Sequence, residues 1–177
     1  MDSIKKIAIT GPESTGKSTL TRQLAEHYKT VWVPEYARTY INQLNRPYER
    51  NDLTEMAKGQ ISHEEKLLLE SNNFLFCDTD LSVIKIWSEH KYGIVDPFIL
   101  TEYESKSYDL YLLMDIDLGW EYDPQRENPE LRKFFFDWFE RILKSKSVPY
   151  RIIRGNAEER FENAQKVIDE YFSTIRN

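Results

Sequence analysis

The chain has 177 residues, a length at which one domain can bury a sizeable core, and 40% of the residues are hydrophobic. Acidic residues (30) outnumber basic residues (24), and the resulting net charge of −6 argues against nucleic acid as a partner. The single cysteine excludes an internal disulfide, and the sequence has no signal peptide and no apolar run that could span a membrane, so we expect a cytoplasmic protein.

The first predicted elements surround a phosphate-binding loop. Residues 4–10 form an apolar strand pattern, and apolar residues recur at helical spacing from Leu20 to Tyr28. Between them, residues 11–18 (GPESTGKS) match the pattern G-x-x-x-x-G-K-[ST] at every fixed position, in the strand–loop–helix context that it requires. We expect Lys17 to reach the β- and γ-phosphates of ATP and Ser18 to bind Mg²⁺. The residues predicted to hold ATP here are Gly11, Glu13, Ser14, Thr15, Gly16, Lys17, Ser18 and Thr19.

The next segments place polar residues at a strand end. Residues 30–34 predict a second strand that ends at Pro34, so Glu35-Tyr36-Ala37-Arg38 follows its carboxyl end, where open α/β sheets bind ligands. Asp52 with Glu55 three residues later predicts the start of a helix that extends to Leu68, and Gly59 weakens that helix.

Two further strands and a loop follow. Residues 74–78 form a continuous apolar run that ends at Asp78, which is typical of a buried parallel strand, and Asp80 leads into a helix through Trp87. A short helix ending near residue 107 precedes a strand at 108–114. Residues 115–130 are polar, contain two prolines and a glycine, and predict a mobile lid loop.

The last segments complete an alternating pattern. An amphipathic helix is predicted from Leu131 to Leu143, a fifth strand at 148–153, and a final helix up to Ile175. Strands that alternate with helices predict an α/β fold with three α/β/α layers, a mainly parallel five-stranded sheet and a small lid. Together with the phosphate loop this is a P-loop NTPase fold, and we expect residues 1–177 to be a single kinase domain.

The absence of an Asn-Lys-x-Asp segment excludes guanine-specific GTPases, and the chain is too short for a large motor, which leaves compact kinases. A kinase needs an acid near the acceptor hydroxyl, an acid for Mg²⁺ and cations over the transferred phosphoryl group. Glu35 and Asp78 are the candidate acids, with their two roles unassigned, and either could instead cap a helix. Arg126 and Arg132 flank the lid and could swing over the phosphates or remain on the surface.

Several residues are candidates for the acceptor. Asp80 could hold ribose hydroxyls or serve as an N-cap, and Arg38 could contact the acceptor or pair with Glu35. The aromatic candidates are Tyr36, Trp87, Trp120 and Tyr122. Trp120 is favoured because a polar loop offers it little core to join, whereas the apolar helix around Trp87 predicts plain packing.

Five segments together resemble the ribosylnicotinamide kinase domain of NadR-type NAD-salvage proteins. They are residues 11–18, 35–38, 77–80, 108–113 and 120–126, in the same order and across nearly the whole chain. The resemblance implies ATP- and Mg²⁺-dependent phosphorylation of the 5′-hydroxyl of nicotinamide riboside to nicotinamide mononucleotide.

The resemblance also implies roles for single residues. Trp120 matches the lid tryptophan and would stack on the pyridinium cation, Arg126 would bind phosphate, and Asn156 would border the adenine. The predicted catalytic residues are Lys17, Glu35, Asp78 and Arg126; the predicted substrate residues are Tyr36, Arg38, Asp80, Trp120 and Asp123; the predicted metal ligands are Ser18 and Asp78. Pro124 stands where glycine is usual in the lid motif, which leaves the lid geometry open.

Two alternatives stay open: a kinase for another nucleoside or nucleotide, and a non-catalytic ATP-binding regulatory protein. The presence of Glu35, Asp78, Asp80 and Arg126 together argues against the second. The helix-turn-helix and adenylyltransferase parts of multifunctional NadR proteins are not found in these 177 residues, so we expect the kinase module alone. The sequence does not predict an oligomeric state.

Overall fold

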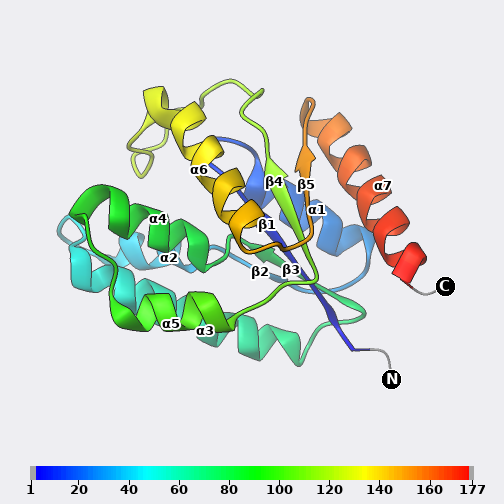
Figure 1. Ribbon diagram of the computed structural model, residues 1–177, viewed down its shortest axis with the longest axis horizontal. Helices are drawn as coiled ribbons and strands as arrows, with labels where there is room; N and C mark the ends of the chain where they lie inside the picture. The colour runs from blue at the N-terminus through cyan, green and yellow to red at the C-terminus, as the bar shows by residue number, and fades with distance from the viewer. Residues whose placement is uncertain (1–2, 176–177) are drawn as a thin grey trace.

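A computed structural model describes residues 3–175, so the ends of the predicted 1–177 domain lie outside the described residues. Its centre is a five-stranded sheet in the order β2-β3-β1-β4-β5, and every neighbouring pair of strands is parallel (Figure 1). The strands are β1 (Lys5–Thr10), β2 (Trp32–Val33), β3 (Phe74–Asp78), β4 (Leu110–Met114) and β5 (Tyr150–Ile153).

Helices cover both faces of the sheet. They are α1 (Lys17–His27), α2 (Tyr36–Gln43), α3 (Arg50–Leu68), α4 (Leu81–Tyr92), α5 (Pro97–Ser105), the short 3₁₀ helix η1 (Pro129–Leu131), α6 (Arg132–Ser145) and α7 (Ala157–Ile175). Helices α1 and α7 pack on one face, and α4 and α6 on the other, with α2, α3 and α5 in a cluster beside α4 (Figure 1). The predicted three-layer α/β/α fold is therefore confirmed.

The alternation of side chains along the strands explains the two cores. Ile7 and Ile9 of β1 point into the core under α1 and α7, whereas Ala8 between them faces α4 and α6. Both faces are covered by helices, which is why β3 and β4 are apolar along nearly their whole length.

Strands β2, β4 and β5 are shorter than predicted, and two helix starts differ from the prediction. Helix α2 begins at Tyr36, directly after the two-residue strand β2, where only a strand end was predicted. Helix α3 has Glu49 as its N-cap, and Asp52 is the third helical residue, whose carboxylate accepts a 2.7 Å hydrogen bond from the Glu49 amide. The prediction of Asp52 as the cap was wrong because acids spaced by three residues occur in two overlapping registers, 49/52 and 52/55.

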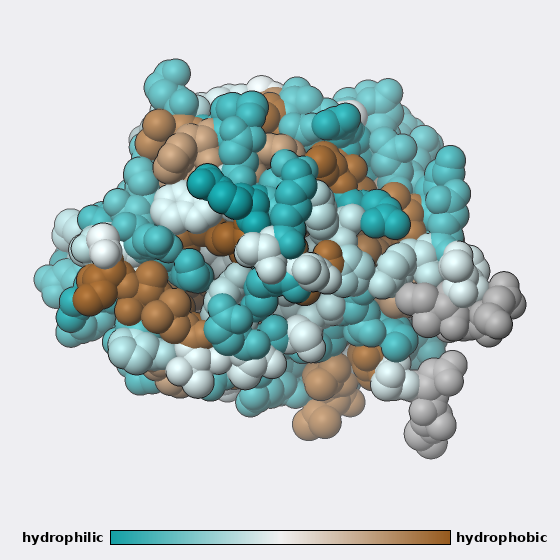
Figure 2. Space-filling view, in the orientation of Figure 1, coloured by the Kyte–Doolittle hydropathy of each residue, from teal (hydrophilic) through white to brown (hydrophobic). Residues whose placement is uncertain are grey.

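The surface is mixed in character. On the face shown in Figure 2, hydrophobic residues form separate patches among polar ones. None of the helices within residues 3–175 has the length and apolar character needed to cross a bilayer.

Candidate active site

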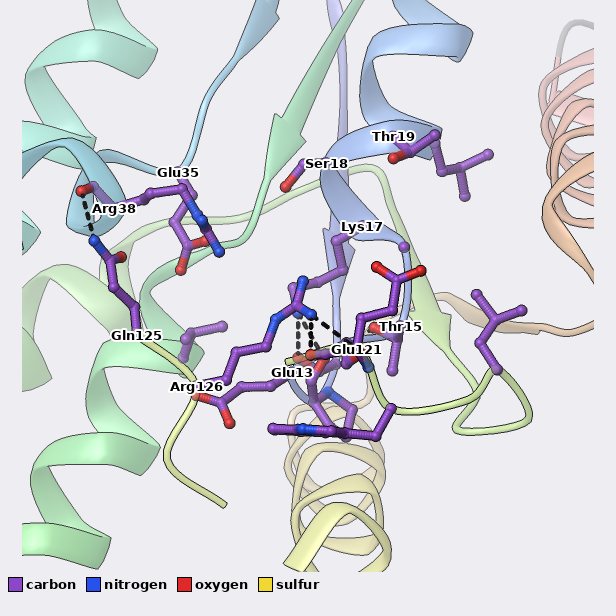
Figure 3. Close-up of a pocket in the computed structure, with 18 of the residues that line it drawn as sticks. Glu13, Thr15, Lys17, Ser18, Thr19, Glu35, Arg38, Glu121, Gln125 and Arg126 are labelled. Atoms are coloured by element: carbon purple, nitrogen blue, oxygen red, sulfur yellow. Dashed lines mark hydrogen bonds between the residues drawn. The ribbon is translucent and has the colours of Figure 1, made fainter. Parts of the chain in front are cut away.

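A cavity of about 440 Å³ opens above the phosphate loop (Figure 3). Its walls come from the loop at residues 11–16, α1, α2, the lid between β4 and α6, and two residues each of α4, α6 and α7. The loops that follow β1, β2 and β4 all contribute, so the cavity lies at the carboxyl edge of the sheet, as predicted.

The phosphate loop has the backbone that its glycines allow. Gly11 and Gly16 have φ angles of 130° and 79°, and a Cβ on Gly11 would lie 3.0 Å from the main-chain oxygen of Met114. Gly16 is the N-cap of α1, so the free N–H groups of the first turn point toward the cavity. The loop therefore offers an anion site where the sequence predicts one.

Lys17 lies at the centre of the site. Its ammonium donates hydrogen bonds to the main-chain oxygens of Gly11 (3.0 Å) and Pro12 (2.7 Å). Burial lowers the pKa of Lys17, while the nearby carboxylates of Glu35, Asp78 and Glu13 raise it. A cation held in this way can move to phosphate oxygens that enter the loop.

The two candidate acids, Glu35 and Asp78, both lie close enough to Lys17 to raise its pKa. Glu35 is the N-cap residue of α2 and lines the cavity, whereas Asp78 ends β3 and is only 1% exposed. Burial and the negative charge of Glu35 raise the pKa of Asp78 to about 6, against a hydrogen bond from Ser18 and the charge of Lys17, which lower it. The structure therefore brings Lys17, Ser18, Glu35 and Asp78 together.

The donor set near Ser18 fits Mg²⁺ held jointly with a nucleotide. The Oδ1 atom of Asp78 is buried and has no hydrogen-bond partner among the described residues, which leaves one oxygen free to accept a ligand. Within residues 3–175 no three His, Cys, Asp or Glu residues gather into a metal site. Mg²⁺ is commonly held by one or two carboxylates, with phosphate oxygens and water completing its octahedron. Ser18 and Asp78 suit that arrangement.

The lid lies against the phosphate loop. The Glu13 carboxylate accepts hydrogen bonds from the amides of Glu127 (3.2 Å) and Asn128 (3.3 Å), and Ser14 Oγ accepts one from the Glu121 amide (2.8 Å). Arg132 donates to the main-chain oxygens of Leu118 (2.8 Å) and Ser14 (3.1 Å). These bonds attach the lid to the loop at residues 11–16 through Glu121, Glu127 and Asn128.

Of the two predicted lid arginines, Arg126 faces the cavity. Its Nη1 donates to Glu121 O (2.5 Å) and Ser14 Oγ (3.3 Å), and Figure 3 shows its guanidinium close to Lys17. Arg132 is not among the described residues of the cavity wall, and its donors serve the lid backbone instead.

Arg38 and Asp123, which the sequence assigned separately to the acceptor, bind each other. Arg38 Nη1 lies 2.8 Å from Asp123 Oδ2, and Arg38 lines the cavity whereas Asp123 is absent from the described wall. Glu35, the alternative partner considered for Arg38, makes no ion pair with it within the described residues.

Besides Asp78 and Asp123, three further predicted residues lie away from the described cavity wall. Asp80 is 3% exposed at the N-cap of α4, and its carboxylate accepts from the hydroxyls of Thr10 (3.1 Å) and Ser82 (2.5 Å). Asn156 Oδ1 accepts from the amides of Glu158 and Glu159 at the start of α7. Tyr36 packs its ring on Gly59 and His63. Asp80 thus occupies the N-cap position of α4 with its carboxylate bonded to the Thr10 and Ser82 hydroxyls, and its role toward the acceptor stays a prediction.

Trp87 extends the aromatic prediction. It packs against the core beneath α4 and α6, as predicted, and it also lines the same cavity as Trp120, while Tyr122 is 85% exposed and lies outside the described wall. Trp87 stacks on Tyr48 with ring centroids 6.4 Å apart, and the ammonium of Lys91 lies 3.8 Å from the Tyr48 centroid.

Sequence reasoning missed Arg160, which lines the cavity although it is only 2% exposed. Its guanidinium donates to the main-chain oxygens of Ile153 (3.1 Å) and Asp115 (3.0 Å) and contacts the Asp117 carboxylate. The signal was present in the sequence, because Arg160 stands four residues before Ala164 on the buried stripe that continues through Ile168 and Phe172.

Comparison with known proteins identifies a matching family, relatives in sequence and solved structures with a similar fold. A family model described as an AAA domain matches residues 6–160. The trifunctional NAD biosynthesis/regulator protein NadR of Escherichia coli is 24% identical over 98% of the chain, and the NadR of Salmonella typhimurium is also 24% identical, over 94%. The chain spans less than half the length of these relatives (44% and 42%), and the resemblance to NadR-type proteins is confirmed.

Solved structures share the fold. A NadR protein in complex with NR superposes with a TM-score of 0.82 at 22% identity, over 96% of this chain and 52% of that one. A thymidylate kinase from Ehrlichia chaffeensis superposes with a TM-score of 0.71 at 15% identity, over 95% of this chain and 100% of that one. The architecture is that of the P-loop kinases.

Proposed function

The chain belongs to the AAA domain family, and from this premise we propose that it is an ATP-dependent kinase that phosphorylates the 5′-hydroxyl of nicotinamide riboside to nicotinamide mononucleotide. The observation that carries the proposal is the gathering of Lys17, Glu35 and Arg126 on one cavity, with Ser18 and Asp78 beside them. We further propose that residues 1–177 act as one kinase domain with a lid at about 115–130, in the cytoplasm.

On the nucleotide side, the loop amides and Lys17 would hold the β- and γ-phosphates of ATP. Arg126 would add a second cation as negative charge develops on the transferred phosphoryl group. Ser18 and Asp78 would hold Mg²⁺, which when bound neutralises charge on the phosphates. The free Oδ1 of Asp78 supports this assignment, because a buried carboxylate oxygen without a donor is costly unless a ligand completes it.

On the acceptor side, Glu35 is the better candidate for the base because it lines the cavity and Asp78 is absent from its described wall. As the 5′-oxygen bonds to the γ-phosphorus, its proton would pass to the Glu35 carboxylate. The bond from the γ-phosphorus to the β–γ bridging oxygen would break, and ADP would leave. The protein would supply positions and charge without a covalent intermediate.

The choice of nicotinamide riboside rests on the relatives and on the two tryptophans. The sequence relatives are named for NAD biosynthesis, and a structural relative is described in complex with NR. Trp87 and Trp120 both line the cavity, and the face of an indole attracts a cation such as the pyridinium ring. A cavity of about 440 Å³ lies in the usual size range of small-molecule sites.

A kinase for another nucleoside or nucleotide is the second candidate. The superposition on the whole length of a thymidylate kinase favours it, because the fold and the phosphate machinery are shared. A non-catalytic nucleotide-binding protein is the third.

A panel of acceptors separates the three. The purified chain would be incubated with Mg-ATP and nicotinamide riboside, thymidine, deoxycytidine, deoxyadenosine or thymidine monophosphate, and kcat/KM measured for each. We expect nicotinamide riboside to exceed the others at least about tenfold, and Lys17→Ala to abolish transfer. A preference for another acceptor would select the second candidate, and inertness toward all of them the third.

A further inference from the structure

The lid is attached not only to the phosphate loop but also to α2, the helix that begins at Glu35. Arg38 Nη1 of α2 lies 2.8 Å from Asp123 Oδ2 of the lid. One helical turn further along α2, Asn42 Oδ1 accepts a 2.6 Å hydrogen bond from Gln125 Nε2. Residues 38 and 42 share a face of α2 at i, i+4 spacing, so two lid side chains meet one side of this helix.

The lid turn is shaped to make both contacts. Asp123 Oδ1 accepts from the Gln125 amide (2.9 Å) across Pro124, and Asp123 O accepts from the Arg126 amide (3.0 Å). The turn that presents Asp123 to Arg38 therefore also fixes the backbone of Arg126, whose side chain reaches Ser14 of the phosphate loop.

Both oxygens of the Asp123 carboxylate are already used. Oδ2 holds Arg38 and Oδ1 closes the lid turn, and the described cavity wall does not contain Asp123. A residue that bound the acceptor directly would face the cavity, which Asp123 does not do among the described wall residues. Asp123 has the contacts of a residue that holds the lid.

We propose that Arg38 and Asp123 are a pair of positioning residues, a latch that holds the lid on α2 and keeps Arg126, Glu35 and the acceptor together while water is excluded from phosphoryl transfer. The proposal rests on the proposed kinase function, but not on which acceptor is used. It replaces separate substrate contacts for the two residues with one contact between them.

The exposure of the pair suits a contact that opens in each cycle. The side chains of Arg38 and Asp123 are 44% and 20% exposed, and ion pairs in such surroundings contribute about 1 kcal/mol or less. A contact of this size adds little to fold stability, yet it shifts a balance between open and closed lids about fivefold at 1 kcal/mol.

The test is a double-mutant cycle with Asp123→Asn, Arg38→Gln and the double variant. Phosphorylated acceptor and ADP are measured separately, using nicotinamide riboside or the acceptor that the panel selects. We expect each single variant to lower kcat for transfer about two- to fivefold and to raise the ADP released per transfer, because water reaches the open site. The double variant should match the singles, since each removes the same contact.

Two further variants sharpen the cycle. Asp123→Glu keeps the charge and should restore most of the coupling between ADP and product. Lys133→Gln and Asp137→Asn break a comparable ion pair on α6, where the side chains are 71% and 48% exposed, and should leave both products unchanged. The latch would be overturned if the losses of activity in the two single variants multiply in the double variant, while KM rises and the ADP released per transfer is unchanged. That result would mean that Arg38 and Asp123 contact the acceptor separately.

A second measurement keeps the latch testable if no acceptor is phosphorylated. Trypsin can cleave after Arg126 in the lid, and we expect cleavage in the presence of a non-hydrolysable ATP analogue to be at least about threefold faster in Asp123→Asn, Arg38→Gln and the double variant alike. Equal cleavage of wild type and variants would overturn the latch, whereas absent transfer with faster cleavage would overturn only the kinase function.

Discussion

Lys17 Nζ donates a 2.7 Å hydrogen bond to the main-chain oxygen of Pro12, so the cation of the phosphate loop is bonded to the loop itself. An entering phosphate must draw it away. Lys17→Ala should remove most of the rise in melting temperature that Mg-ATP gives the wild type, because the ligand loses its main cation. The melting temperature without ligand should stay the same or rise, since burial of the charge lowers the pKa of Lys17 and so costs the folded state energy.

Thermal unfolding with and without an ATP analogue checks both parts, with the exposed Lys133→Ala as the control. An unchanged ATP-induced shift in Lys17→Ala would remove the lysine from the phosphate site.

Because the pKa of Asp78 is raised, we expect Asp78→Asn to increase the free energy of unfolding by an amount that depends on pH. The carboxyl titrates near pH 6 when folded and near 3.9 when unfolded, so within this window the folded protein holds the extra proton. The stability that this group contributes is complete below about pH 4 and is lost as pH rises through about 6. Asparagine does not titrate, so the variant should exceed the wild type by about 1–3 kcal/mol at pH 7.5 and by little near pH 4.5.

Urea unfolding in EDTA at pH 4.5, 6 and 7.5 measures this difference. Asp137→Asn on the surface of α6 serves as the control, and its difference from the wild type should not change over this pH range. The same Asp78→Asn variant should lose phosphoryl transfer about 100-fold or more if Asp78 holds the metal. A variant less stable than the wild type at pH 7.5 would show that the Asp78 carboxylate is not strained by burial.

Gly59→Ala should reverse the usual effect of alanine in a helix. Alanine normally stabilises a helix interior by about 1 kcal/mol relative to glycine, but a Cβ at position 59 would lie 2.0 Å from Cε1 of Tyr36. The Tyr36 ring also packs edge-on against the His63 ring, with centroids 4.9 Å apart, so it cannot shift freely. We expect a loss of about 1–3 kcal/mol and lower kcat, because Tyr36 adjoins Glu35.

Chemical unfolding checks the sign, and Tyr36→Ala supplies the matched background. In that background Gly59→Ala should cost nothing, since the space is open. A Gly59→Ala protein more stable than the wild type would show that Tyr36 moves without penalty.

The two tryptophans should discriminate acceptors by charge. Trp87→Ala and Trp120→Ala should each raise KM for nicotinamide riboside more than KM for its neutral dihydro form, by about 2- to 30-fold, the range of one cation–π contact. Steady-state kinetics with both acceptors measure this ratio. Tyr122→Ala, on the same lid but 85% exposed, is the control. Equal losses for the two acceptors would mean packing without charge recognition.

Local patterns were sufficient to predict the sheet and the phosphate loop. Ile7 to Ile9 and Phe74 to Cys77 are apolar runs typical of buried parallel strands, and the spacing of Gly11, Gly16 and Lys17 matches the phosphate-loop pattern. The proximity of Glu35 and Asp78 could be predicted because parallel strands end at one edge of the sheet.

The remaining features depend on contacts far apart in the sequence. Arg38 and Asp123 are 85 residues apart, and neither position shows a pattern that names its partner. Trp87 sits on a helix that is mostly buried, so periodicity alone assigned it to the core, yet the cavity reaches it. Arg160 was visible as a cation on a buried stripe, but only the structure shows that it lines the site.

The most direct test of the proposed reaction is phosphorus NMR of the product formed from nicotinamide riboside and Mg-ATP by the wild-type chain. The account predicts one new phosphate monoester resonance coupled to the two 5′-methylene protons, growing in step with ADP and absent with Lys17→Ala. ADP released with inorganic phosphate alone, or a phosphate ester at another hydroxyl of the ribose, would contradict it.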